Sequence, residues 1–145
     1  MPQINPELVR IFEQTAALLE LTGGNRFRVN AYDRAARAVD RLATDLSEMN
    51  DRDIQDIDGI GEGMAKRIAQ YKQEGRIDEH RKLLDEVPRG LLELLDVPGL
   101  GPKGAAYLWK EAGVENKTDL RKKAEAGELQ KLKGFGKKKV QNLLE

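Results

Sequence analysis

Hydrophobic positions along the chain recur with the 3.6-residue period of an α-helix. Asn5 followed by Pro6 predicts an N-cap with proline at the first helical position, and apolar residues then repeat at helical spacing until Gly23 and Gly24 end the helix. A second amphipathic helix is predicted over 27–42, with an inward face formed by Val29, Ala31, Tyr32, Ala35, Ala36, Ala38 and Val39. No stretch has the period-two alternation of a strand, so the pattern predicts an all-α fold.

Shorter helices are expected in the rest of the chain. Residues 47–58 suggest one, and another is predicted from Gly61 to about Gln73, closed by Gly75. A short helix at 90–95 and a longer one at 102–113 repeat that pairing. The link around Glu86-Val87-Pro88-Arg89 predicts a boundary near residue 87. Two small helical subdomains, 1–87 and 88–145, are therefore expected.

One motif occurs three times, as IDGIGEGMAKRI at 57–68, VPGLGPKGAAYL at 97–108 and LKGFGKKKVQNL at 132–143. Each copy has an aliphatic residue, two glycines around one apolar residue, and a helix that begins at once. Glycine enters positive φ without steric cost, so this pattern lets the chain reverse tightly while the apolar residue anchors the turn. The repeat predicts tandem helix-hairpin-helix motifs.

The glycine hairpins have the features of a phosphate-binding site. Because each turn leads directly into a helix, unpaired backbone N–H groups and the positive end of the helix dipole face outward. Phosphate contacts of this kind ignore base identity, so the expected activity is sequence-independent DNA binding. In the alternative interpretation the glycine turns merely join helices. The residues expected at the phosphates are Gly59, Gly61, Gly99, Gly101, Lys103, Gly104, Gly134, Gly136 and Lys137.

Charge changes this picture locally. The chain has 25 basic and 25 acidic residues, so its zero net charge argues against bulk attraction to nucleic acid. Residues 1–87 carry a net charge of −4 and residues 88–145 a net charge of +4. Asp56, Asp58 and Glu62 flank the first glycine turn, whereas lysines surround the third. The first hairpin is therefore expected to bind phosphate more weakly than the other two.

Composition excludes several classes of site. The chain has no cysteine and a single histidine, His80, which argues against a disulfide, a zinc site or a Ser-His hydrolase centre. No apolar run approaches the length of a membrane span, and residues 1–10 do not resemble a signal peptide. A cytoplasmic protein without tightly bound cofactor or membrane partner is expected, and a monomer is the expected state.

Three longer segments resemble the N-terminal portion of a family X DNA polymerase of the bacterial type. They are NRFRVNAYDRAARAV at 25–39, IDGIGEGMAKRIAQYKQEGRI at 57–77 and LLELLDVPGLGPKGAAYLWKEAGV at 91–114. The resemblance implies a lyase-like domain that binds 5′-phosphate, followed by hairpins that hold gapped or nicked DNA in repair. The palm, with its carboxylates for two metal ions, would follow residue 145, so this chain is expected to lack polymerase activity.

The same resemblance implies particular site residues. A K⁺ or Na⁺ ion would be held by backbone carbonyls of Gln55, Ile57 and Ile60 in the first hairpin, and of Leu95, Val97 and Leu100 in the second. In the 5′-phosphate pocket Arg28 stands for a lysine and Tyr32 matches the family, whereas two further basic positions are Gln55 and Gly63 here. The expected pocket therefore has fewer basic residues than that of family members in which these positions are basic.

Two other functions remain open. A lyase needs an amine that can form a Schiff base, but the position of the family's lysine holds Arg67, whose guanidinium stays protonated. Lys66 points elsewhere on the helix, and both side chains are expected on a solvated face.

The arginines of 26–41 could line a DNA groove or pair with Asp33, Asp40 and the acids of 45–62. Tyr107 and Trp109 are expected in the core rather than on DNA bases. The second alternative to DNA binding is that the chain is a docking module for other repair proteins.

Overall fold

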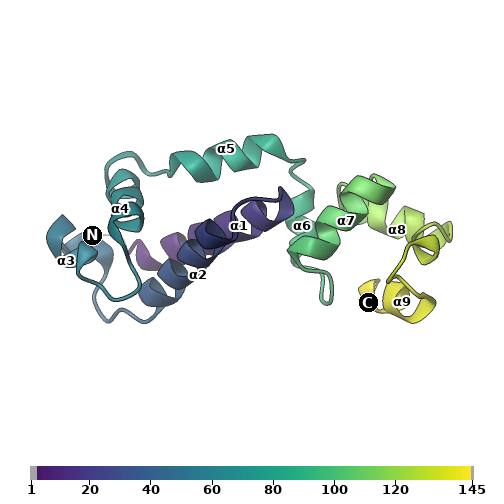
Figure 1. Ribbon diagram of the computed structural model, residues 1–145, viewed down its shortest axis with the longest axis horizontal. Helices are drawn as coiled ribbons and strands as arrows, with labels where there is room; N and C mark the ends of the chain where they lie inside the picture. The colour runs from purple at the N-terminus through teal and green to yellow at the C-terminus, as the bar shows by residue number, and fades with distance from the viewer. Residues whose placement is uncertain (1–2, 145) are drawn as a thin grey trace. The chain divides into compact units, whose positions relative to one another are not determined.

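The computed structural model describes residues 3–144, and every regular element within them is helical, which confirms the all-α prediction. The chain divides into two compact units between Leu83 and Leu84, four residues before the boundary expected at residue 87. The first contains α1 (Asn5–Leu21), α2 (Arg26–Asp40), η1 (Leu46–Glu48), α3 (Asp51–Gln55), α4 (Glu62–Glu74) and most of α5 (Asp78–Glu86). The second contains α6 (Leu91–Leu95), α7 (Pro102–Ala112), α8 (Lys117–Glu125), η2 (Leu129–Lys131) and α9 (Lys137–Leu143) (Figure 1).

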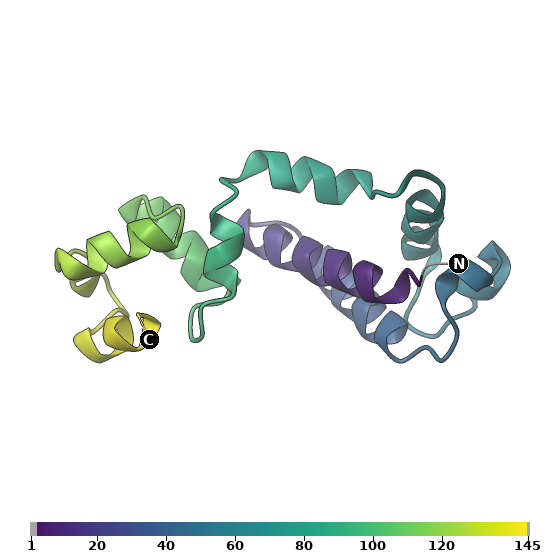
Figure 2. The same ribbon diagram turned by 180° about the vertical axis from the view of Figure 1, so that it is seen from behind.

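The core of the first unit is the pair formed by α1 and α2, which lie side by side in both views (Figures 1 and 2). Phe12 and Tyr32 are fully buried, with ring centroids 5.8 Å apart and planes tilted by 58°. Burying a side chain of this size contributes about 1.5–3 kcal/mol. The predicted inward face of α2 is confirmed except at Ala31, which is only partly buried.

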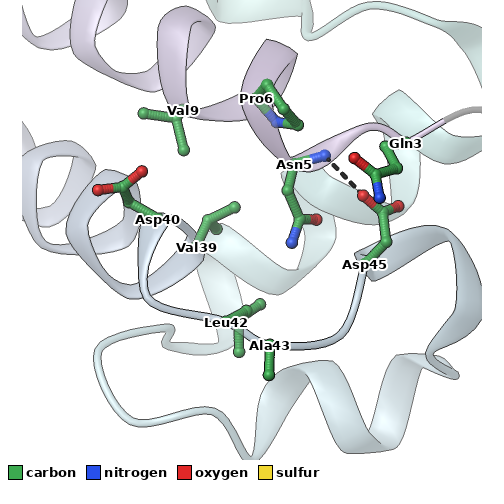
Figure 3. A pocket seen from close by; sticks show the side chains of 9 residues that line it. All are labelled: Gln3, Asn5, Pro6, Val9, Val39, Asp40, Leu42, Ala43 and Asp45. Carbon is green, nitrogen blue, oxygen red and sulfur yellow. Dashed lines mark hydrogen bonds between the residues drawn. The ribbon is translucent and has the colours of Figure 1, made fainter.

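A distant carboxylate caps the start of α1. Asn5 is the first helical residue rather than the N-cap, so the predicted cap was wrong by one position. The Asp45 carboxylate accepts hydrogen bonds from the backbone N–H of Ile4, at 3.0 and 3.1 Å. It also accepts from the N–H of Asn5 at 3.1 Å (Figure 3). The Asn5 side chain in turn accepts from the N–H of Leu46 at 2.8 Å. These contacts join the beginning of α1 to the link after α2.

Two helices were missed because each buries very little. In α5 only Leu83 is buried, and in α8 only Leu120 and Ala124 are. A cap signal for α8 is nevertheless present in the sequence. The Asn116 side chain accepts from the N–H of Asp119 at 2.7 Å, while Asp119 accepts from the N–H of Glu115 at 3.1 Å. This is a reciprocal arrangement of the capping-box kind.

In the second unit α7 supplies the centre of the core. Ala105 and Leu108 on α7 are fully buried, together with Val114 just beyond the helix. Gly90 lies so close to the chain at 115–116 that a Cβ there would be 2.5 Å from the carbonyl oxygen of Glu115. Among the helices of residues 3–144, none combines the length and the apolar character needed to cross a membrane.

The cap by Asp45 makes stability depend on pH. Desolvation raises the pKa of Asp45, but hydrogen bonds from Ser47, Ile4 and Asn5 outweigh it and lower the pKa from 3.8 to about 2. The stabilisation is therefore present above about pH 4 and is lost as the pH falls toward 2. Asp45→Asn should lower the free energy of unfolding at pH 7 by about 1 kcal/mol, measured by urea denaturation.

At pH 2 Asp45 is partly protonated in the folded protein, so the difference in stability between the wild-type protein and Asp45→Asn should be much smaller than at pH 7. A difference as large as that at pH 7 would contradict the prediction. Asp40→Asn is the matched control, since it removes the same charge from the last residue of α2. Because a negative charge is unfavourable at a helix C-terminus, this control should not lower stability.

Candidate nucleic-acid interface

The three glycine hairpins share one turn hydrogen bond and positive φ at the first glycine. In the first, the N–H of Ile60 donates to the carbonyl of Ile57 at 3.0 Å. The equivalent bonds, from Leu100 to Val97 and from Phe135 to Leu132, are both 3.1 Å long. The first glycine of every pair has positive φ, at 95° for Gly59, 87° for Gly99 and 85° for Gly134. The sequence repeat therefore corresponds to a repeated turn, although the second glycine has positive φ only in the second hairpin, at Gly101.

The apolar residue between the two glycines anchors each turn, as predicted. Ile60, Leu100 and Phe135 are only 4%, 4% and 5% exposed. The side chains around them differ from hairpin to hairpin. A Cβ on Gly104 would come within 2.9 Å of a Leu100 methyl carbon, while the Lys139 ammonium lies 4.8 Å from the Phe135 ring centroid. Burial of the middle residue keeps the two glycines at the surface.

Each turn ends at the N-terminus of a helix. The second glycine is the N-cap of α4, α7 and α9, and its carbonyl accepts the first helical hydrogen bond, at 2.9 Å from Ala65, 2.9 Å from Ala105 and 3.1 Å from Val140. A glycine has no side chain to occupy the N–H groups of the first turn. The three N-cap glycines are all exposed, so these N–H groups can be reached from solvent.

The hairpins differ in charge. Around the second and third turns, Lys103, Lys137, Lys138 and Lys139 are exposed. The first turn instead lines a hollow of about 520 Å³ that contains Asp56 and Asp58 together with Arg34 of α2. Gly59 packs against α2, since a Cβ there would be 3.2 Å from the Cβ of Ala38. The first hairpin is thus held against α2 in an acidic setting that one arginine partly offsets.

The second and third hairpins are joined by an aromatic contact. The rings of Tyr107 on α7 and Phe135 are stacked, with centroids 5.7 Å apart and an angle of 7° between their planes. Tyr107 and Trp109 are both partly buried. Tyr107 therefore contacts protein, in line with the expected core role.

Arg28 and Tyr32 contact a residue that the sequence analysis did not identify. The hydroxyl of buried Tyr32 donates to the carboxylate of Glu79 on α5, and the Arg28 guanidinium forms an ion pair with the same carboxylate. The ion pair of Arg28 is therefore with Glu79, and not with Asp33, with Asp40 or with the acids of 45–62. Burial raises the pKa of Tyr32, an effect that Arg67 and Arg28 only partly oppose, so the phenol stays protonated at neutral pH.

Arg67 joins the same cluster, so its expected place on a solvated helix face was wrong. Its Nε donates to the Tyr32 hydroxyl at 2.7 Å, and its Nη2 lies 3.5 Å from the Glu79 carboxylate. Its Nη1 donates to the carbonyl of Gly63 at 2.9 Å. Lys66, by contrast, is exposed, with its ammonium 3.9 Å from the Glu62 carboxylate.

The carbonyls considered for a monovalent cation lie in matching places of the first two hairpins. The carbonyls of Ile57 and Val97 each accept the hydrogen bond that closes their turn. A carbonyl oxygen has two lone pairs, so each retains one for another ligand. Gln55 and Leu95 are the last residues of α3 and α6, and carbonyls at a helix C-terminus lack partners within the helix.

Comparisons with known proteins agree with these features. A family model described as "Helix-hairpin-helix domain" matches residues 3–77, and one described as "SAM-like Helix-hairpin-helix tandem" matches residues 91–145. The chain is 40% identical over 139 residues to "DNA polymerase/3'-5' exonuclease PolX" of Bacillus subtilis (strain 168). The aligned region covers 96% of this chain but 24% of that relative, in its N-terminal part. The resemblance to a family X polymerase is thereby confirmed.

The hairpin geometry predicts which glycines are irreplaceable. Gly101 has φ 51° and ψ 178°, a region almost closed to other residues, so Gly101→Ala should lower the free energy of unfolding by about 1–3 kcal/mol. Gly136 holds the equivalent position with φ −69° and ψ 169°, which any residue can adopt. Gly136→Ala should therefore cost less, at most about 1 kcal/mol, which is the ordinary difference between glycine and alanine at an N-cap.

Urea unfolding followed by the fluorescence of Trp109, the single tryptophan, reports on the unit that contains both glycines. In neither case would the added Cβ come within 4 Å of a neighbouring atom, so a steric clash does not confuse the comparison. Equal losses for the two variants would contradict the assignment of strain to Gly101.

Proposed function

Because the chain belongs to the helix-hairpin-helix domain family, we propose that it binds DNA independently of sequence, through the phosphates of the DNA backbone. The observation that carries this proposal is the threefold recurrence of one turn with the same hydrogen bonds, each ending at an exposed helix N-terminus. A helix N-terminus attracts anions through its free N–H groups and its dipole. Contacts of this kind fix the position of a protein on DNA without reading bases.

The second hairpin is the best-equipped phosphate site. Pro102 is the first residue of α7 and has no N–H, so the donors there come from Lys103 and Gly104. Lys103 also brings an exposed charge to the same place. In the third hairpin, Lys137 begins α9 beside Gly136 and supplies both an N–H and a charge. The first hairpin contributes less because Asp56 and Asp58 lie beside its turn.

We assign the first two hairpins a K⁺ or Na⁺ ion as an auxiliary ligand. The carbonyls of Gln55, Ile57 and Ile60, and of Leu95, Val97 and Leu100, are suited to such an ion because carbonyl oxygen is a hard ligand. The ion would add positive charge beside a bound phosphate. At the first hairpin it would also offset Asp56 and Asp58.

The preferred DNA has a gap or nick with a 5′-phosphate, in a repair context. Arg28 and Tyr32 supply a charged donor and a hydroxyl donor for that phosphate. The similar Bacillus protein is named as a polymerase and exonuclease, and this chain spans about a quarter of it. We therefore regard the chain as the DNA-holding part of a gap-filling polymerase whose catalytic residues lie elsewhere.

The chain itself is proposed to have no lyase activity. Schiff-base formation needs a neutral amine, and the guanidinium of Arg67 is held between Tyr32 and Glu79. Lys66 is exposed beside Glu62, on another face of α4. A covalent adduct trapped by borohydride on DNA with an abasic 5′ end would overturn this assignment.

Two substitutions at one position separate the backbone from the side chain. Lys103→Ala removes only an exposed charge and should weaken binding to duplex DNA about threefold. Lys103→Pro removes the same charge and also the N–H, at a helix position where proline is tolerated, and should cost about a further tenfold.

Dissociation constants from fluorescence anisotropy provide the measurement, and circular dichroism checks that α7 is intact. Equal losses for the two variants would show that charge alone binds phosphate. If neither variant alters DNA affinity, the hairpins would fit a protein-docking surface better.

The 5′-phosphate preference can be tested at the start of α2. Gapped DNA with a 5′-phosphate should bind more tightly than the same DNA with a 5′-hydroxyl, by no more than about tenfold, or 1.4 kcal/mol. Arg28→Ala should abolish this difference. Arg26→Ala is the matched control, since Arg26 carries the same charge two residues away and lies 3.5 Å from Glu20 instead. Loss of the preference in both variants would indicate a general charge effect.

A further inference from the structure

Three donors converge on one carboxylate in the first unit. Arg28 and Tyr32 of α2 and Arg67 of α4 all contact Glu79, which lies with Asp78 in the first turn of α5. The Tyr32 side chain is fully buried, whereas those of Arg28 and Arg67 are 47% and 30% exposed. The Glu79 side chain is only 18% exposed, so its carboxylate is enclosed by the donors rather than free in solvent.

The donor set has the chemistry of a phosphate site. Two guanidinium groups supply charge and several N–H donors, and the protonated phenol supplies one O–H. The Arg67 guanidinium is further oriented by its bond to the Gly63 carbonyl and lies over the Tyr32 ring, with Cζ 5.5 Å from the centroid. The donors are thus ordered around an anion that belongs to the protein itself.

We propose that Glu79 is an internal competitor of the DNA 5′-phosphate, and that a terminal phosphate enters the pocket by displacing the Glu79 carboxylate. This inference rests on the proposed role of Arg28 and Tyr32 in 5′-phosphate binding. Two positive charges against one carboxylate leave a local excess of one positive charge. A terminal phosphate carries between −1.5 and −2 charges near neutral pH, so it matches two guanidinium groups better than a carboxylate does.

Displacement needs only a local change. Glu79 lies in the first turn of α5, and its flexible side chain can adopt other staggered rotamers. Rotation of that side chain toward solvent would free the pocket while α5 keeps its backbone. A phosphate bound beside the remaining carboxylate would be repelled, so exchange is favoured over joint occupancy.

The consequence is that the chain discriminates against weak anions. A DNA phosphodiester has a single negative charge and offers little advantage over the resident carboxylate. A 5′-terminal phosphate has the extra charge that makes exchange favourable. Glu79 therefore keeps diesters along the strand out of the pocket, and it also lowers the affinity of the pocket for a 5′-terminal phosphate.

The test is Glu79→Gln, which keeps the size of the side chain and removes its charge. The ratio of affinities for 5′-phosphorylated and 5′-hydroxyl gapped DNA should rise about five- to tenfold, because the pocket is no longer occupied by its own anion. Asp78→Asn is the matched control. It removes one charge from the same turn of α5, but Asp78 faces Arg76, with Nε 3.5 Å from its carboxylate, and the ratio should stay unchanged.

The DNA results separate this inference from the proposed function. The displacement proposal would be overturned if Glu79→Gln raised the affinity for both DNAs by the same factor. It would also be overturned if the variant lost the preference for 5′-phosphorylated DNA that the wild-type protein shows. The proposal would fail as well if Glu79→Gln bound 5′-hydroxyl gapped DNA normally and the ratio of the two affinities did not change. That result would leave DNA binding by the hairpins intact. Absence of all DNA binding would instead reject the proposed function.

A second measurement does not need DNA. Inorganic phosphate can be titrated into the wild-type protein and Glu79→Gln while the Nε–H signals of Arg28 and Arg67 are followed by NMR. The dissociation constant should be about five- to tenfold lower in the variant. Equal constants in a variant that remains folded, as judged by its other amide signals, would overturn the proposal.

Discussion

The geometry of all three candidate sites depends on burial of one apolar side chain between two glycines. Ile60, Leu100 and Phe135 anchor their turns in the interior, and this anchoring is possible because the preceding glycine adopts positive φ. The backbone then enters a helix without a capping side chain. The same constraint that closes the turn therefore exposes the N–H groups of the helix start. The fold of the turns and the proposed phosphate recognition therefore depend on the same local arrangement.

This arrangement explains how a chain of zero net charge could hold a polyanion. A broad basic surface would bind DNA by releasing the counterions condensed on its phosphates, and its affinity for DNA would fall steeply as the salt concentration rises. Here the donors are backbone groups at fixed positions, and side-chain charge is added only where Lys103 and Lys137 lie beside a turn. The acids of the first unit can therefore serve stability, as Asp45 does at the start of α1. They need not oppose binding at the second and third hairpins.

Local signals in the sequence predicted a large part of this structure. The period of apolar residues identified α1 and α2, and the glycine repeat identified the turns before α4, α7 and α9. The cap of α1 was misassigned because Asp45, forty residues from Asn5, takes the role expected of Asn5 itself. Glu79 was missed for a similar reason, since it meets Tyr32 across 47 residues. Nothing in the local sequence around Glu79 indicates that contact, because α5 has a weak apolar pattern.

The Glu79 cluster also shows why the proposed 5′-phosphate pocket should not be judged by counting basic residues. Gln55 and Gly63 are neutral, which suggested a thin pocket, but Gly63 lends its carbonyl to orient Arg67. Arg67 cannot act as a lyase amine, yet its charge remains available to an anion. A buried Tyr32 hydroxyl needs a partner in the absence of DNA, since an unsatisfied buried hydroxyl costs about 1–3 kcal/mol. Glu79 meets that need, so the residue that stabilises the Tyr32 hydroxyl is the one that we propose a phosphate displaces.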